Sequence, residues 1–77
     1  MNTESTVTLD ARGLNCPLPI LRTKKALNGL ETGDTLYLIS SDPGSVKDID
    51  AFCKQTGNEL LENTTESGEF TFIIRKT

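Results

Sequence analysis

Four segments of the chain have the features of β-strands. The first alternates apolar and polar residues with a two-residue period, and the last has Phe70, Phe72 and Ile74 on one side. β-branched or aromatic side chains are frequent in these segments, and Gly, Pro, Asn or Asp residues lie at most of their ends. The third segment is the weakest of the predicted strands, and Glu66-Ser67-Gly68 predicts a hairpin turn between it and the fourth. The predicted strands are Thr6–Asp10, Thr35–Ser40, Asn58–Thr64 and Glu69–Lys76.

Apolar positions spaced three or four residues apart predict a helix between the first two strands. It begins at Pro17 or Leu18, since proline is tolerated in the first turn of a helix, and it ends at Gly29. The residues expected to face the core are Ile20, Thr23, Leu27 and Leu30.

A second helix is predicted from Ser45 to about Gln55, where Gly57 stops it. Ser45 and Asp48 have the spacing of a capping box. Its apolar face consists of Val46, Ile49, Phe52 and Cys53. The predicted order is therefore β-α-β-α-β-β, which indicates a two-layer α/β sandwich: a four-stranded mixed sheet with both helices on one face.

Length and composition narrow the class of protein. The 77 residues are enough for one domain, residues 1–77, and the net charge of −3 argues against non-specific nucleic-acid binding. Histidine is absent and there are only two cysteines, so one chain lacks the ligands of a zinc site and we expect no metal. The longest apolar runs are too short to span a bilayer, and the first residues lack the features of a signal peptide, so we expect a cytoplasmic protein.

The stretch Cys16-Pro17-Leu18-Pro19 contains the candidate reactive group. A residue before proline avoids helical angles, so Cys16 should lie just outside the helix, near unpaired N–H groups and the positive end of the helix dipole. Pro17 and Pro19 would hold the backbone so that the sulfur points outward, and Arg12 would add positive charge nearby. We therefore expect the pKa of Cys16 to lie below the ordinary value of about 8.5. The alternative is a loop cysteine that only packs.

The residues around Cys16 exclude two kinds of thiol chemistry. Pro19 stands where a Cys-X-X-Cys pair has its second thiol, and without histidine no side chain relays a proton for acyl transfer. A lone thiolate can accept a sulfur atom from another protein's persulfide and later release it, which needs no cofactor. Cys53 lies within the apolar face of the second helix, which favours a buried, reduced, structural cysteine.

One further surface could serve such an exchange. On the side of the first helix opposite the core, the pattern places two leucines and two basic residues close to Cys16. Scattered surface leucines are common, but this set favours a docking surface for an acidic partner protein. Its members are Leu18, Leu21, Arg22 and Lys25.

The segment Leu9-Asp-Ala-Arg-Gly-Leu-Asn-Cys-Pro-Leu-Pro-Ile-Leu21 resembles the motif of the TusA (SirA-like) family of sulfur carrier proteins. The resemblance continues to the end of the chain through Lys24-Lys25, Gly33-Asp34, Ser41-Asp-Pro-Gly44, Asp48-Ile49, Phe52 and Arg75-Lys76. It implies a β-α-β-α-β-β sandwich, a persulfide on Cys16, and two protein partners: a donor such as a cysteine desulfurase or rhodanese, and a downstream acceptor.

The resemblance leaves several pathways open. Segments 15–22, 42–48 and 54–59 are most similar to the branch that works in dissimilatory sulfur oxidation, followed by carriers for tRNA 2-thiouridine formation or molybdenum cofactor assembly. Whether the chain counts as an enzyme in its own right also stays open. Two other classes remain: a regulatory or binding module without chemistry at Cys16, and a small RNA-binding domain of similar fold. The net charge and the four aromatic residues argue against the latter.

Overall fold

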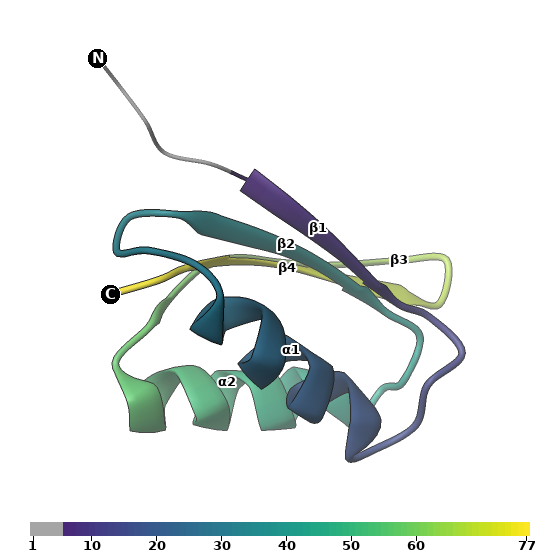
Figure 1. Ribbon diagram of the computed structural model, residues 1–77. Helices are drawn as coiled ribbons and strands as arrows, with labels where there is room; N and C mark the ends of the chain where they lie inside the picture. The colour runs from purple at the N-terminus through teal and green to yellow at the C-terminus, as the bar shows by residue number, and fades with distance from the viewer. Residues whose placement is uncertain (1–5) are drawn as a thin grey trace.

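The computed structural model describes residues 6–77. The absence of signal-peptide features was inferred from the first six residues, and all but the last of them lie outside the described residues. The observed elements are β1 (Thr6–Ala11), α1 (Leu18–Asn28), β2 (Thr35–Ser40), α2 (Ser45–Thr56), β3 (Glu59–Glu66) and β4 (Glu69–Arg75) (Figure 1). The predicted order is confirmed, and the predicted ends differ from the observed ones by at most two residues.

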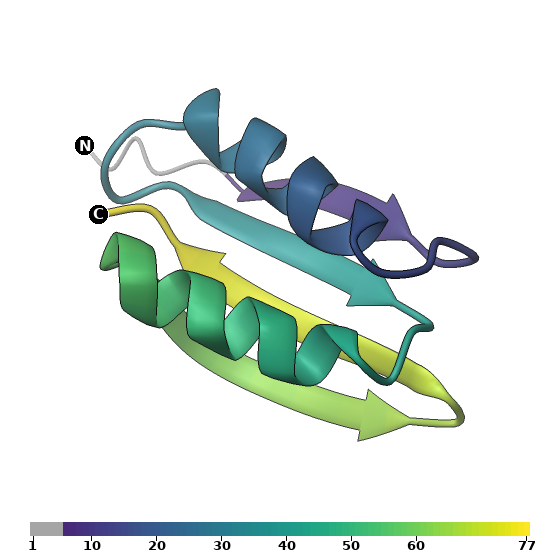
Figure 2. The same cartoon turned by 90° about the horizontal axis from the view of Figure 1, so that it is seen from below.

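The four strands form a single mixed sheet in the order β1-β2-β4-β3. β1 and β2 are parallel, whereas β4 is antiparallel to both of its neighbours. Both helices cover the same face, with α1 over β1 and β2 and α2 over β4 and β3 (Figures 1 and 2). The predicted two-layer sandwich is therefore confirmed. No helix within residues 6–77 combines the length and the apolar character needed to cross a membrane.

The hairpin between β3 and β4 uses the two residues that the sequence indicates. Ser67 and Gly68 have φ angles of 52° and 79°, and two successive positive values match the right-handed twist of the flanking strands. Near the start of β3 the pairing register shifts between Leu60 and Glu62. Leu61, at the shift, remains 51% exposed.

The hydrophobic core lies between the sheet and the helices. Its fully buried apolar residues are Ala11, Leu27, Leu36, Leu38, Ile49, Cys53, Phe72 and Ile74. In α1, Thr23 and Leu27 are buried as predicted. Ile20, and Leu30 just beyond the end of the helix, are half-buried and pack against the core. Pro19 is also buried, which the spacing did not predict. Thr23 satisfies its buried hydroxyl by donating to the Pro19 carbonyl oxygen at 2.7 Å.

The predicted capping box at the start of α2 is wrong. Gly44 occupies the N-cap position without a side-chain cap, and Ser45 is already the first residue of the helix. The turn before the helix is organised by Asp42 instead. Its Oδ1 accepts the N–H of Gly44 at 3.1 Å, and its carbonyl oxygen accepts the Ser45 hydroxyl at 2.6 Å. The Ser45 side chain is buried, and Asp48 does not cap the helix.

Candidate functional site

Cys16 lies in the loop between β1 and α1, immediately before the residue that caps the helix. The loop that leads from β2 into α2 lies at the same end of the molecule, because β1 and β2 are parallel and each precedes a helix (Figure 1). Cys16 is exposed and its peptide bond to Pro17 is cis. The predicted position just outside the helix is confirmed.

Two hydrogen bonds attach the Cys16 loop to the loop after β2. The Gly13 N–H donates to Ser41 Oγ at 2.8 Å, and the Cys16 N–H donates to Asp42 Oδ2 at 3.0 Å. Gly13 has a φ of 83°, a conformation that a residue with a side chain adopts only with strain. Asp42 therefore holds both the start of α2 and the backbone of the candidate nucleophile.

The thiol of Cys16 is hydrogen-bonded to a carboxylate. Its Sγ donates to Asp48 Oδ2 at 3.2 Å, across the space between the two helices. This bond, followed by desolvation and the negative charges of Asp48 and Asp42, raises the pKa of Cys16 above its ordinary value. The expectation of a lowered pKa is wrong: each cause that acts on this thiol, led by its hydrogen bond to Asp48, raises the pKa.

Arg12 does not serve the thiol as predicted. Its guanidinium forms ion pairs with Asp10 at 2.9 Å and with Glu69 at 3.3 Å. Hydrogen bonds from Arg12 hold the pKa of Asp10 at about 2. Arg12 thus connects the end of β1 to the start of β4 through these two ion pairs.

A hollow of about 310 Å³ opens beside Cys16, between α1 and α2. Most of its walls are apolar, and Asp48 is the only acidic residue among those that line it within residues 6–77. The lining residues are Cys16, Pro17, Ile20, Asp48, Ala51, Phe52 and Gln55. The arrangement leaves room for a side chain of another protein next to the sulfur.

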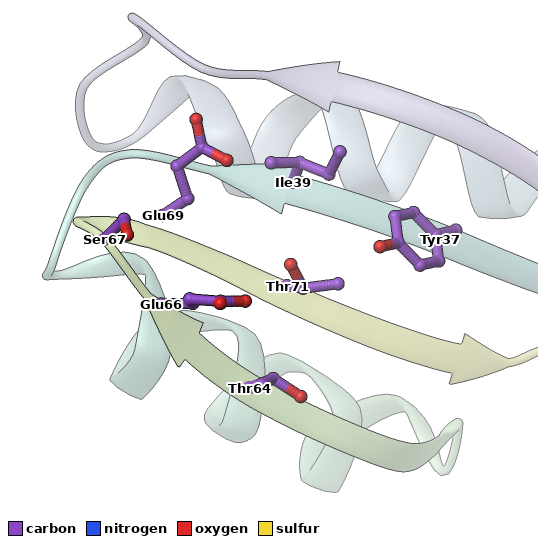
Figure 3. A pocket seen from close by; sticks show the side chains of 7 residues that line it. All are labelled: Tyr37, Ile39, Thr64, Glu66, Ser67, Glu69 and Thr71. Atoms are coloured by element: carbon purple, nitrogen blue, oxygen red, sulfur yellow. The ribbon is translucent and has the colours of Figure 1, made fainter.

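A second hollow, of about 350 Å³, lies on the sheet face that the helices leave open. Figure 3 shows Tyr37, Thr71 and Thr64 along adjacent strands, with Glu66 and Glu69 toward the hairpin. Its lining contains hydroxyls and carboxylates but no cysteine. The exposed thiol of Cys16 lies instead beside the hollow on the helix side.

The four residues predicted to form a docking surface are all exposed. Leu18 and Leu21 are 43% and 53% exposed, and the side chains of Arg22 and Lys25 are exposed as well. Among the ion pairs of residues 6–77, none involves Arg22 or Lys25. That this surface of α1 docks a partner protein stays a prediction.

Cys53 is buried, as its place in the apolar face of α2 predicts. It is only 4% exposed, and neither cysteine forms a disulfide. Desolvation raises the pKa of the Cys53 thiol to about 11. The chain therefore has one accessible thiol and one inaccessible thiol.

Two residues of the site, Asp42 and Asp48, were missed at the level of sequence. The signal for Asp42 was present, because Asp-Pro-Gly is a turn sequence whose carboxylate commonly accepts nearby backbone N–H groups. Asp48 was assigned to a cap, and nothing local indicates that it faces a cysteine 32 residues away.

Comparison with known proteins gives one consistent result. The profile of the family described as Sulfurtransferase TusA matches residues 7–76. The sulfur carrier protein TusA of Allochromatium vinosum is 64% identical over 69 residues, which cover 90% of this chain and 91% of that protein. A putative sulfur carrier protein of Bacillus subtilis, YrkI, is 48% identical over 68 residues, 88% of this chain and 91% of its own length.

Among solved structures, the chain is similar to a SirA-like protein from Desulfitobacterium hafniense. The TM-score is 0.80 at 28% sequence identity, and the match covers 90% of this chain and 95% of that one. The match covers nine-tenths of the chain, so the family assignment and the architecture agree.

Proposed function

Because the chain belongs to the TusA family of sulfur carrier proteins, we propose that Cys16 accepts a sulfane sulfur as a persulfide and passes it to a second protein. The observation that carries this proposal is the contrast between the two cysteines. Cys16 is exposed beside an open hollow, whereas Cys53 is sealed in the core. A carrier needs one thiol that two different proteins can reach.

The exchange is redox-neutral and involves only cysteine sulfur. The Cys16 thiolate attacks the outer sulfur of the donor's persulfide, so that a new S–S bond forms on Cys16 as the donor's S–S bond breaks. The donor's cysteine leaves as a thiolate and takes up a proton. Delivery is the same exchange in the other direction, with a thiol of the acceptor as the nucleophile.

The surface around Cys16 supports docking through α1. Leu18 and Leu21 offer apolar area, while Arg22 and Lys25 offer positive charge without partners among residues 6–77. A donor with an acidic rim around its own cysteine would complement this surface, and opposite charges speed encounter.

The donor in this proposal is a rhodanese or a cysteine desulfurase. Of the possible relays we rank dissimilatory sulfur oxidation first, and tRNA thiolation or molybdenum cofactor assembly second. The support for this order is the resemblance of segments 15–22, 42–48 and 54–59. We place the exchange in the cytoplasm, where reducing conditions keep cysteines such as these two free.

The test is persulfide loading followed by intact mass measurement. The protein is incubated with a persulfidated rhodanese and, separately, with a persulfidated cysteine desulfurase. Wild type should gain the mass of one sulfur atom and lose it on reduction. Cys53→Ala should behave in the same way, and Cys16→Ser should gain nothing. Equal labelling of the two cysteines would contradict the assignment, and the faster donor identifies the pathway.

A further inference from the structure

The carboxylate that holds the Cys16 thiol has no role in the exchange described so far. We propose that Asp48 is a positioning residue that keeps Cys16 protonated in the free carrier, and that a cationic side chain of the docked sulfur donor releases the thiol by pairing with Asp48. This inference rests on the proposed function and adds to it a chemical requirement on the donor: a lysine or arginine close to its persulfide.

Geometry supports the first half of this proposal. Asp48 lies in the first turn of α2, and its Oδ2 accepts the Cys16 thiol at 3.2 Å. A carboxylate at this distance favours the neutral thiol for two reasons: the hydrogen bond needs the proton, and a thiolate would face a like charge. Small electrophiles that reach the exposed sulfur therefore meet a weak nucleophile.

Within residues 6–77, the two charges that act on the sulfur are both negative. From α2 the sulfur faces Asp48, and from the loop after β2 it faces Asp42. On its own loop, the nearest cation in sequence, Arg12, is paired with Asp10 and Glu69. The other groups that line the hollow are uncharged: Pro17, Ile20, Ala51, Phe52 and Gln55.

The second half follows from how open this site is. Cys16 and Asp48 line the same hollow, so a side chain that enters it reaches both. None of the ion pairs of residues 6–77 involves Asp48 or Asp42. A thiol is a weak hydrogen-bond donor, whereas lysine and arginine form charge-assisted bonds with carboxylates, so an entering cation displaces the thiol from Asp48.

The proton balance of the step is closed. When the donor's cation pairs with Asp48, the Cys16 proton passes to solvent and the thiolate attacks the outer sulfur of the donor's persulfide. The donor's cysteine leaves as a thiolate and takes a proton from solvent. One S–S bond forms, one breaks, and the number of bound protons is unchanged. The donor thus activates the thiol that accepts its sulfur.

The test compares two changes that remove the same charge from the same helix. Asp48→Asn removes the carboxylate beside the sulfur, and Asp50→Asn removes one that pairs with Lys54 at 3.0 Å. Both are made in a Cys53→Ala background, so that only Cys16 reacts. Each variant is measured for the rate of alkylation against pH and for the rate of sulfur transfer from the persulfidated donor.

For Asp48→Asn we expect the two rates to separate. The alkylation midpoint should move to lower pH and alkylation at pH 7 should become several-fold faster, because the thiolate is no longer opposed by a carboxylate. Transfer from the donor should become several-fold slower, because the donor's cation has lost its partner. Asp50→Asn should change neither rate. A merely structural role for Asp48 would slow both reactions together.

Other outcomes overturn the proposal in identifiable ways. An unchanged alkylation midpoint would show that Asp48 does not hold the thiol. If both rates rose together, no donor cation would be involved. If the wild type accepted sulfur from neither donor, the proposed function would fail, while the alkylation arm would still report on Asp48 and Cys16. Thermal unfolding checks each variant, and Asp48→Ser provides the same readouts if asparagine disturbs folding.

Discussion

Replacing Leu21 by serine should weaken docking of the sulfur donor by a factor that the structure allows us to calculate. Leu21 lies on the outer side of α1 and is 53% exposed. Burying an exposed leucine completely contributes about 1.5–3 kcal/mol, so covering the exposed half contributes about 0.8–1.5 kcal/mol. Since about 1.4 kcal/mol corresponds to a factor of ten, the affinity for the donor should fall about four- to twelve-fold.

The assay is sulfur transfer at donor concentrations below saturation, where the rate is proportional to affinity. Leu61→Ser is the matched control, because Leu61 has nearly the same exposure, 51%, but lies on β3, the edge strand farthest from β1 in the sheet. Leu61→Ser should leave transfer unchanged. Neither variant should alter the alkylation of Cys16. Equal effects of the two substitutions, or a parallel loss of alkylation in Leu21→Ser, would refute the docking surface on α1.

Two further predictions concern stability. Burial raises the pKa of Cys53 to about 11, above the ordinary value of about 8.5. The unfolded chain therefore loses this proton first, and the free energy of unfolding should fall as pH rises between these values. Denaturant titrations across that range should show a smaller fall in Cys53→Ala, and identical slopes would contradict the burial argument. Asp42→Ala removes the acceptor of the Cys16 and Gly44 N–H groups, so it should destabilise the fold by about 1 kcal/mol, the usual net contribution of a hydrogen bond, and lower the Tm by about 4–8 °C in calorimetry. An unchanged Tm would mean that Asp42 does not hold the two loops together.

Local patterns were sufficient for most of the architecture because α1, β2, α2 and β4 each bury one face. Leu36, Leu38 and Phe72 alternate with half-buried or exposed neighbours, so their two-residue period was visible in the sequence. In α1, Thr23 and Leu27 show the helical period in the same way. The hairpin was predictable because Ser67-Gly68 suits the positive φ angles that such a turn requires.

The electrostatics of the site could not be predicted in this way, because they depend on contacts between residues distant in the sequence. Arg12 was expected near Cys16, but it pairs with Asp10, two residues back, and with Glu69, which is 57 residues away and becomes adjacent only when β4 completes the sheet. The raised pKa of Cys16 has a similar origin, since Asp48 and Asp42 belong to the next β-α unit. The helix dipole and the charge of Arg12 were the only influences that the local sequence indicated.

Once the buried face of α2 is known, the orientation of Asp48 follows from helix geometry. Ser45, Ile49 and Cys53 are buried at intervals of four residues, so they define the side of α2 that faces the sheet. A step of about 100° back from Ile49 places Asp48 on the flank of the helix. Ala51, Phe52 and Gln55 follow at the next three positions of that flank, and all four residues line the hollow beside Cys16. The missing information was therefore which flank of α2 lies beside α1. The strand order determines this, because β2 lies between β1 and β4. α1 consequently packs beside α2, with Cys16 just before its start.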